Sequence, residues 1–98
     1  MNRISVLELN QLSNPIIIDI RNAYYYNISH IDNSINIPYY NLLNNYSHYL
    51  NKNSTYYLYC DMGEQSGEIA DRLGKFGYHI YSVDGGYVEY LRIKGDTF

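Results

Sequence analysis

The chain has one cysteine, Cys60, and it stands between a strand-like and a helix-like segment. Residues 55–60 (TYYLYC) are aromatic and apolar, which is typical of a buried strand. Residues 66–77 (SGEIADRLGKFG) have apolar groups at helical spacing. A cysteine at the carboxyl end of a strand, facing the start of a helix, is well placed to ionise, because the positive end of the helix dipole stabilises a thiolate. Cys60 is therefore a candidate nucleophile.

The loop after Cys60 has the features of an anion-binding turn. Gly63 gives the backbone conformational freedom in the middle of the loop. Successive N–H groups in such a loop can point inward and surround an anion, either the thiolate itself or a sulfur or oxygen anion beside it. Free cysteine is also among the most frequently buried residue types, so a packing role for Cys60 stays open at this point. The predicted anion contacts are the backbone groups of Asp61, Met62, Gly63, Glu64, Gln65 and Ser66.

The composition excludes several classes of function. The 98 residues have a formal net charge of −3 and few basic residues, which disfavours binding to nucleic acid or to anionic membranes. No apolar run is long enough to span a bilayer, and the first residues do not resemble a secretory signal. A single cysteine cannot form an internal disulfide. We expect one domain over residues 1–98 in the reducing cytoplasm, with no membrane or nucleic-acid partner.

The histidines give no sign of a metal site. His30, His48 and His79 lack metal-ligand spacing with one another and with Cys60. His30 has no partner at a spacing that suggests a Cys–His dyad, so capping or packing is its predicted role. The histidine spacing therefore predicts no metal site.

Strand-like and helix-like segments alternate along the chain, which indicates an α/β fold with a parallel sheet. The helix at 66–77 is predicted to bury Ile69, Leu73 and Phe76. In an open parallel sheet, ligands bind beyond the carboxyl ends of the strands, so Cys60 lies on the functional edge. Strands are expected at 16–20, 35–38, 55–60 and 78–83; helices are expected at 6–12, 39–50, 66–77 and 87–93, with a short helix or turn within 21–31.

Four stretches of the chain resemble, in order and spacing, the rhodanese-like (sulfurtransferase) family. They are IIIDIR, SHIDNSINIP, YCDMGEQSGEIADRLGKFGY and VDGGYVEY. The resemblance covers nearly the whole chain and implies a four- or five-stranded, mostly parallel sheet with short helices on both faces. The matching residues are Asp19 and Arg21 at the end of the central strand; His30, Ile31, Ile35, Asn36, Ile37 and Pro38; Cys60, Gly63 and Ser66 of the pattern C-x-x-G-x-x-S; and Gly85 and Gly86 of a glycine turn.

What this resemblance implies is sulfur transfer through Cys60. The thiolate would take the outer sulfur of thiosulfate or of a persulfide, and a thiol or cyanide would remove it. The backbone amides of residues 61–65 would surround the terminal sulfur anion. Asp19, Arg21, His30, Gly85 and Gly86 would support the site structurally, and no metal or cofactor would be required.

The phosphatases that share this strand–loop–helix arrangement use a C-x5-R pattern, and this chain departs from it. The position six residues after Cys60 holds Ser66 rather than an arginine that could bind phosphate with two hydrogen bonds. A phosphatase is therefore disfavoured.

The loop also departs from many sulfurtransferases, because Asp61 and Glu64 are acidic and Gln65 replaces a common arginine. Two carboxylates beside the site repel a doubly negative donor, so we expect weak use of thiosulfate and better use of a neutral or protein-borne persulfide. The alternative is a non-catalytic rhodanese-like interaction module. A redox sensor acting through a Cys60 sulfenate is a third possibility, but it lacks a second cysteine to resolve the sulfenate.

Overall fold

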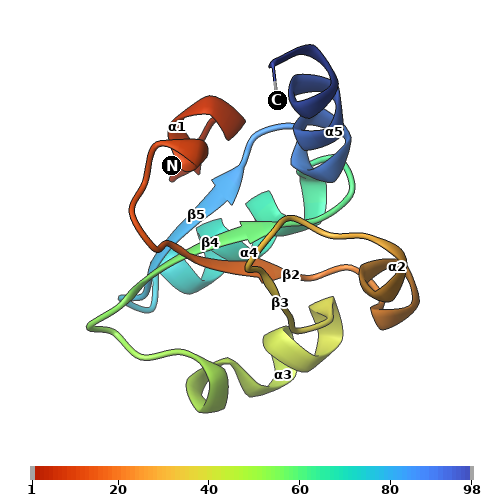
Figure 1. Cartoon of the computed structure of the whole chain (residues 1–98). Coiled ribbons are helices and arrows are strands. Elements are labelled where there is room, and N and C mark those ends of the chain that lie inside the picture. Colours follow the sequence, from red (N-terminus) through yellow and green to blue (C-terminus); the bar gives the residue numbers. More distant parts are fainter. Residues whose placement is uncertain (1, 98) are drawn as a thin grey trace.

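The apolar runs of the sequence form the centre of a five-stranded parallel sheet. This computed structural model describes residues 2–97, and side chains over residues 2–95. The strands lie in the order β1-β5-β4-β2-β3, and every neighbouring pair is parallel (Figure 1). The α/β prediction is confirmed, with five strands. They are β1 (Arg3–Ile4), β2 (Ile16–Asp19), β3 (Ile35–Asn36), β4 (Thr55–Tyr59) and β5 (His79–Val83).

Within residues 2–97, five helices flank the sheet, and helices lie on both of its faces, as expected. Buried residues of α3 and α4 share one apolar cluster with Ile18, Leu58 and Cys60. Buried residues of α1 and α5 share a second cluster with Ile17 and Tyr59 on the opposite face. The first and last helices lie side by side (Figure 1). The helices are α1 (Val6–Asn10), α2 (Ala23–Ile28), α3 (Tyr39–Tyr49), α4 (Glu64–Gly74) and α5 (Gly86–Thr97).

The helix that follows Cys60 differs from its prediction at both ends. It begins at Glu64, two residues before the predicted start, with Gly63 as its N-cap at φ = 100°. It ends at Gly74, so Phe76 lies beyond the last helical turn. The helical spacing that placed Phe76 on the same face as Ile69 and Leu73 therefore does not extend to it. Phe76 is 51% exposed and stacks on Tyr46, which corrects the prediction that it belongs to the buried stripe.

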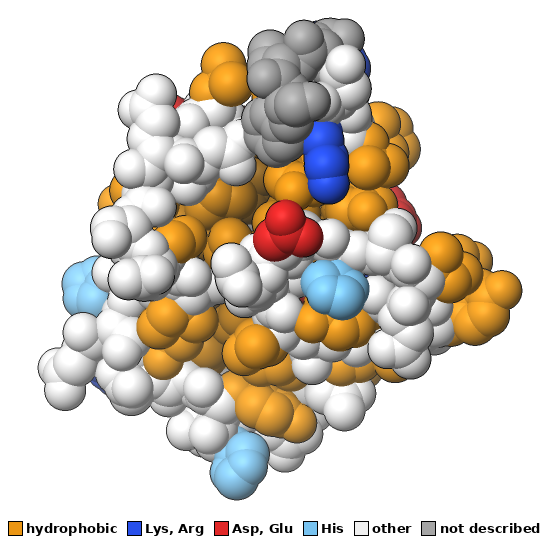
Figure 2. Space-filling model, in the orientation of Figure 1, with side chains coloured by type: hydrophobic (Ala, Val, Ile, Leu, Met, Phe, Trp, Pro, Cys, Tyr) orange, Lys and Arg blue, Asp and Glu red, His pale blue; other side chains and the backbone are white. Residues whose placement is uncertain are grey.

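The face of the molecule shown in Figure 2 is mostly uncharged. In the view of Figure 2, hydrophobic side chains reach solvent in many places, while acidic and basic side chains are sparse. No helix within residues 2–97 combines the length and the apolar character needed to cross a membrane.

Candidate active site at the carboxyl edge of the sheet

Cys60 lies just beyond β4, where the chain turns toward α4. Its side chain is 96% buried, with 4% of its surface exposed. The Gly63 N–H donates to Cys60 Sγ at 3.1 Å, and the Ser66 N–H donates to it at 3.4 Å. Both donors belong to the start of α4, where four backbone N–H groups have no partner within the helix. The local geometry therefore stabilises negative charge on this sulfur.

The predicted loop residues divide into two groups. Within the described chain, the N–H groups of Gly63 and Ser66 contact the sulfur directly. The side chains of the other four loop residues are exposed to solvent above it: Asp61, Met62, Glu64 and Gln65. With the cysteine, these four line a hollow of about 310 Å³, which we name the cysteine hollow.

A pair of buried serines lies behind the cysteine. In its thiol form Cys60 donates to Ser66 Oγ at 3.5 Å, and Ser66 Oγ lies 2.7 Å from Ser82 Oγ on β5. Ser66 and Ser82 are both almost completely buried. Ser66 has one hydroxyl proton, which it donates to the Gly63 carbonyl at 3.4 Å. When Ser82 donates to Ser66, that proton can turn from this long hydrogen bond to an ionised sulfur. Ser82 was not a predicted site residue.

Replacing Ser82 by alanine should therefore slow the alkylation of Cys60 by iodoacetamide at pH 7. The loss of one hydrogen bond worth about 1 kcal/mol corresponds to a rate decrease of about fivefold. Ser34→Ala is the control, because Ser34 is also buried but bonds to the Ile31 carbonyl and the Tyr59 hydroxyl instead. Equal alkylation rates in Ser82→Ala and the unmodified protein would contradict the role of the serine pair.

The predicted glycine turn at Gly85 and Gly86 leads into α5, whose first residues donate hydrogen bonds to the cysteine loop. The Tyr87 N–H donates to the Cys60 carbonyl at 2.9 Å, and the Val88 N–H donates to the Asp61 carbonyl at 3.0 Å. These donors are the first N–H groups of α5, which can approach because Gly86 has no side chain. A Cβ on Gly86 would lie 2.5 Å from the Cys60 oxygen.

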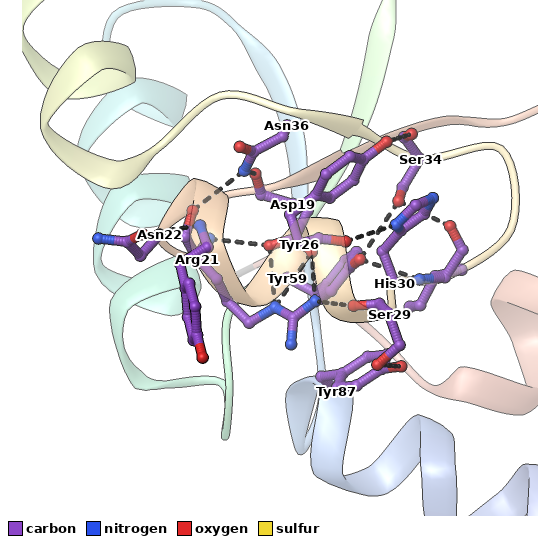
Figure 3. A network of polar contacts seen from close by, with 12 residues as sticks. Asp19, Arg21, Asn22, Tyr26, Ser29, His30, Ser34, Asn36, Tyr59 and Tyr87 are labelled. Carbon is purple, nitrogen blue, oxygen red and sulfur yellow. Dashed lines mark hydrogen bonds and ion pairs between the residues drawn. The ribbon is translucent and has the colours of Figure 1, made fainter.

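Asp19 and Arg21 form a buried ion pair at the end of β2 (Figure 3). Arg21 Nη2 donates to Asp19 Oδ2 at 2.8 Å, and Arg21 Nε donates to both carboxylate oxygens at 3.1 Å. The same Nη2 donates to the Ser29 carbonyl. Burial alone lowers the pKa of Arg21, but the hydrogen bonds and charge of Asp19 outweigh it, so the pKa of Arg21 is raised. Through the Ser29 carbonyl, the pair connects the loop before β3 to the end of β2.

Tyr59 and Tyr87, which sequence analysis did not identify as site residues, lie between the Asp19–Arg21 ion pair and the cysteine loop. The Arg21 guanidinium lies 4.1 Å from the centre of the Tyr87 ring, and Tyr87 stacks on Tyr59. Tyr59 is fully buried, and its hydroxyl accepts the Ile31 N–H at 3.0 Å (Figure 3). Burial, together with the nearby Asp19, raises the pKa of Tyr59, which stays protonated. Tyr87 thus contacts the ion pair with its ring and the cysteine loop with its backbone.

His30 is exposed, and its hydrogen bond and ring contact are both with Tyr26. Its Nδ1 donates to the Tyr26 carbonyl at 2.7 Å, and its ring stacks on Tyr26 with the centroids 3.8 Å apart (Figure 3). These contacts agree with packing rather than acid–base chemistry. Within the described residues, no group of three or more His, Cys, Asp or Glu side chains is placed to hold a metal ion.

A larger hollow lies elsewhere. It measures about 720 Å³ and is bounded by α1, α5 and the loop before β3, on the face of the sheet opposite to Cys60. Its walls include Leu9, Ile17, Ile31 and Tyr90. The candidate active site therefore does not coincide with this larger hollow.

Comparison with known proteins assigns the family. The model of the rhodanese-like domain matches residues 5–93. The chain belongs to the rhodanese-like domain family. A rhodanese-related protein from Thermoplasma volcanium has the same fold, with a TM-score of 0.85 and 25% sequence identity over 94% of this chain and 92% of that one.

Two curated relatives of this rhodanese-like domain are enzymes named for tRNA chemistry. The tRNA sulfurtransferase of Thermoplasma acidophilum is 39% identical over 66 residues, which cover 67% of this chain and 13% of the relative. The tRNA uridine(34) hydroxylase of Buchnera aphidicola is 29% identical over 87 residues, which cover 81% of this chain and 27% of the relative. The chain thus spans about an eighth to a quarter of the length of these relatives. They connect it with a family related to sulfur transfer, and one of them is named for a different reaction.

Proposed function

We propose that this rhodanese-like domain transfers sulfane sulfur through a persulfide on Cys60. The observation that carries the proposal is the pair of N–H groups, from Gly63 and Ser66, that donate to Cys60 Sγ. Donors placed in this way stabilise a thiolate before the reaction and a persulfide anion after it. The sulfurtransferase name of one relative agrees with this chemistry.

The reaction has two displacement steps at sulfur. The Cys60 thiolate attacks the outer sulfur of the donor, and the donor's S–S bond breaks with its electron pair leaving on sulfite or on the donor thiolate. The product is a Cys60–S–S⁻ persulfide. The acceptor thiolate then attacks the outer sulfur, the Cys60 S–S bond breaks, and the electron pair returns to Cys60 as the acceptor gains the persulfide. No net oxidant or reductant is consumed.

The mass of the intact protein tests this proposal. The protein is incubated with thiosulfate and, separately, with polysulfide, and then weighed. We expect a gain of one sulfur atom that cyanide removes as thiocyanate and that is missing in Cys60→Ser. If neither donor adds sulfur to Cys60, the transfer function is wrong.

Glu64→Arg should improve the use of thiosulfate. Glu64 lines the cysteine hollow, so its carboxylate repels a doubly charged donor on approach. Reversing this charge should lower the apparent KM for thiosulfate by about three- to tenfold at low salt, with a smaller effect at about 1 M salt, where charges are screened. Asp32→Arg makes the same charge change in the hollow on the opposite face and should leave the KM unchanged. Equal KM values in Glu64→Arg and the unmodified protein would show that the loop charge does not govern donor choice.

A non-catalytic interaction module is the second candidate. It is favoured by one observation, the outward-facing carboxylates of Asp61 and Glu64 above a cysteine that is almost completely buried. The absence of sulfur uptake from both donors in a folded protein would favour this candidate.

A further inference from the structure

A second hollow adjoins the cysteine hollow. It measures about 290 Å³ and lies between the carboxyl edge of β2 and the start of α3. Tyr25, Tyr39 and Tyr40 line it, and we name it the tyrosine hollow. Asp61 and Gln65 line both hollows, so the two are neighbours across these side chains. A molecule that reacts at Cys60 therefore has a second surface within reach.

The charge around the two hollows is negative. Asp61 and Glu64 are exposed carboxylates on their walls. Arg21 is the one basic side chain among the described residues that line the hollows, and it is only 7% exposed. Its charge is matched by Asp19 at 2.8 Å. These walls repel an anionic group and attract a cationic one.

The aromatic walls favour the same kind of group. Tyr25 is 54% exposed and Tyr40 is 69% exposed, so parts of both rings are available to a ligand. The Tyr39 hydroxyl donates to Glu68 Oε1, which fixes that ring; the charges of both Glu68 and Arg72 act on this tyrosine. Ammonium and guanidinium groups bind over tyrosine rings, and a carboxylate beside the ring strengthens the attraction.

We infer that the partner in sulfur transfer is a polypeptide cysteine with lysine or arginine beside it. This inference rests on the proposed function, because it needs a reactive Cys60. The partner thiol occupies the cysteine hollow, and a basic neighbour lies in the tyrosine hollow between Asp61 and the tyrosine rings. A small thiol fills the first hollow only, whereas a peptide fills both.

The transfer step itself is the second displacement described above. The peptide thiolate attacks the outer sulfur of the Cys60 persulfide, the S–S bond breaks, and Cys60 leaves as the thiolate. The peptide becomes a persulfide. The basic neighbour takes no part in bond formation; it holds the peptide thiol beside the outer sulfur and lowers the thiol's own proton affinity.

The test uses Cys60 that has been loaded with polysulfide and freed of excess donor. The loaded protein is mixed with the capped tripeptide Lys-Cys-Lys or Glu-Cys-Glu, and the loss of the sulfur is followed by mass. Each rate is divided by the rate of the same peptide with a free small disulfide, which removes the difference in intrinsic reactivity. We expect the basic peptide to react about tenfold faster at low salt after this correction.

The variants locate the effect. Asp61→Asn combined with Glu64→Gln should reduce the preference for the basic peptide by about fivefold, and Tyr40→Leu should reduce it by about twofold. Asp32→Asn and Tyr49→Leu are the controls: Asp32 lines the hollow on the opposite face, and Tyr49 is an exposed ring at the far end of α3. An unchanged preference in the double variant, or none in the unmodified protein, would overturn the inference while leaving sulfur loading, and so the proposed function, intact.

Two further outcomes separate the alternatives. Cysteamine and 3-mercaptopropionate form a small pair of opposite charge, and they should show a clearly weaker preference than the peptides. An equal preference would overturn the assignment to a polypeptide and point to a small aminothiol. If polysulfide fails to load Cys60 in the first place, the proposed function is wrong and this inference is overturned with it.

Discussion

Replacing Arg21 by methionine should lower the free energy of unfolding by about 3–5 kcal/mol. Asp19 has no exposed surface, and its carboxylate oxygens accept four hydrogen bonds from Arg21, one of them from the backbone. Removing the guanidinium takes away three of the four hydrogen bonds that this buried charge accepts from residue 21. Urea denaturation, followed by circular dichroism, measures the change.

A double variant separates the cost of the unpaired charge from the loss of packing. Asp19→Asn combined with Arg21→Met removes the charge but keeps an oxygen that can accept the backbone N–H, so it should be more stable than Arg21→Met alone. Arg3→Met is the matched control, because Arg3 pairs with Asp71 at 3.1 Å where both side chains are about one-third exposed. Such a pair contributes about 1 kcal/mol or less. Similar losses in Arg3→Met and Arg21→Met would contradict this account.

The position of Cys60 could be predicted because its causes are local. An apolar aromatic run, a cysteine, a glycine three residues later and a helical pattern are all visible within residues 55–77. They predict a strand, a turn and a helix in this order, and the structure confirms all three, although β4 ends at Tyr59 and α4 begins at Glu64. The exact start of α4 was less predictable, because Glu64 and Gln65 suit a loop as well as a first helical turn.

The serine pair was missed although one signal for it exists. Side chains two residues apart in a strand share a face, so Ser82 of β5 lies on the same face as the fully buried Ile80. A polar residue on a buried face needs a hydrogen-bond partner, and in this chain the partner is Ser66. The pattern could have marked Ser82 as unusual, but only the fold brings α4 and β5 together.

Other contacts had no local signal. The strand β1 has two residues, Arg3 and Ile4, which is too short for any periodicity to be recognised. The contact of Tyr87 with Arg21 joins residues far apart in the sequence. Long-range contacts of this kind depend on the order in which the strands lie in the sheet. Resemblance to a family therefore predicts them better than residue patterns do.

Gly86→Ala should be the most damaging small substitution near Cys60. Gly86 has φ = 60°, and an added Cβ would lie 2.5 Å from the Cys60 oxygen and 2.7 Å from the Asp61 oxygen. These oxygens accept the N–H groups of Tyr87 and Val88, so the loop cannot retreat without losing both hydrogen bonds. We expect a loss of about 2–4 kcal/mol in the free energy of unfolding.

The same substitution should also slow sulfur loading of the folded fraction by about tenfold, because small displacements of a reacting group cost rate steeply. Gly74→Ala is the control: nothing lies within 4 Å of its added Cβ, and it is the last residue of α4. It should be neutral or slightly stabilising, by up to about 1 kcal/mol. Unchanged stability and loading in Gly86→Ala would mean that α5 does not hold the cysteine loop. A stable variant with slow loading would mean that the cysteine loop shifts to make room for the added methyl group. The glycine turn would then determine the position of the sulfur rather than the stability of the domain.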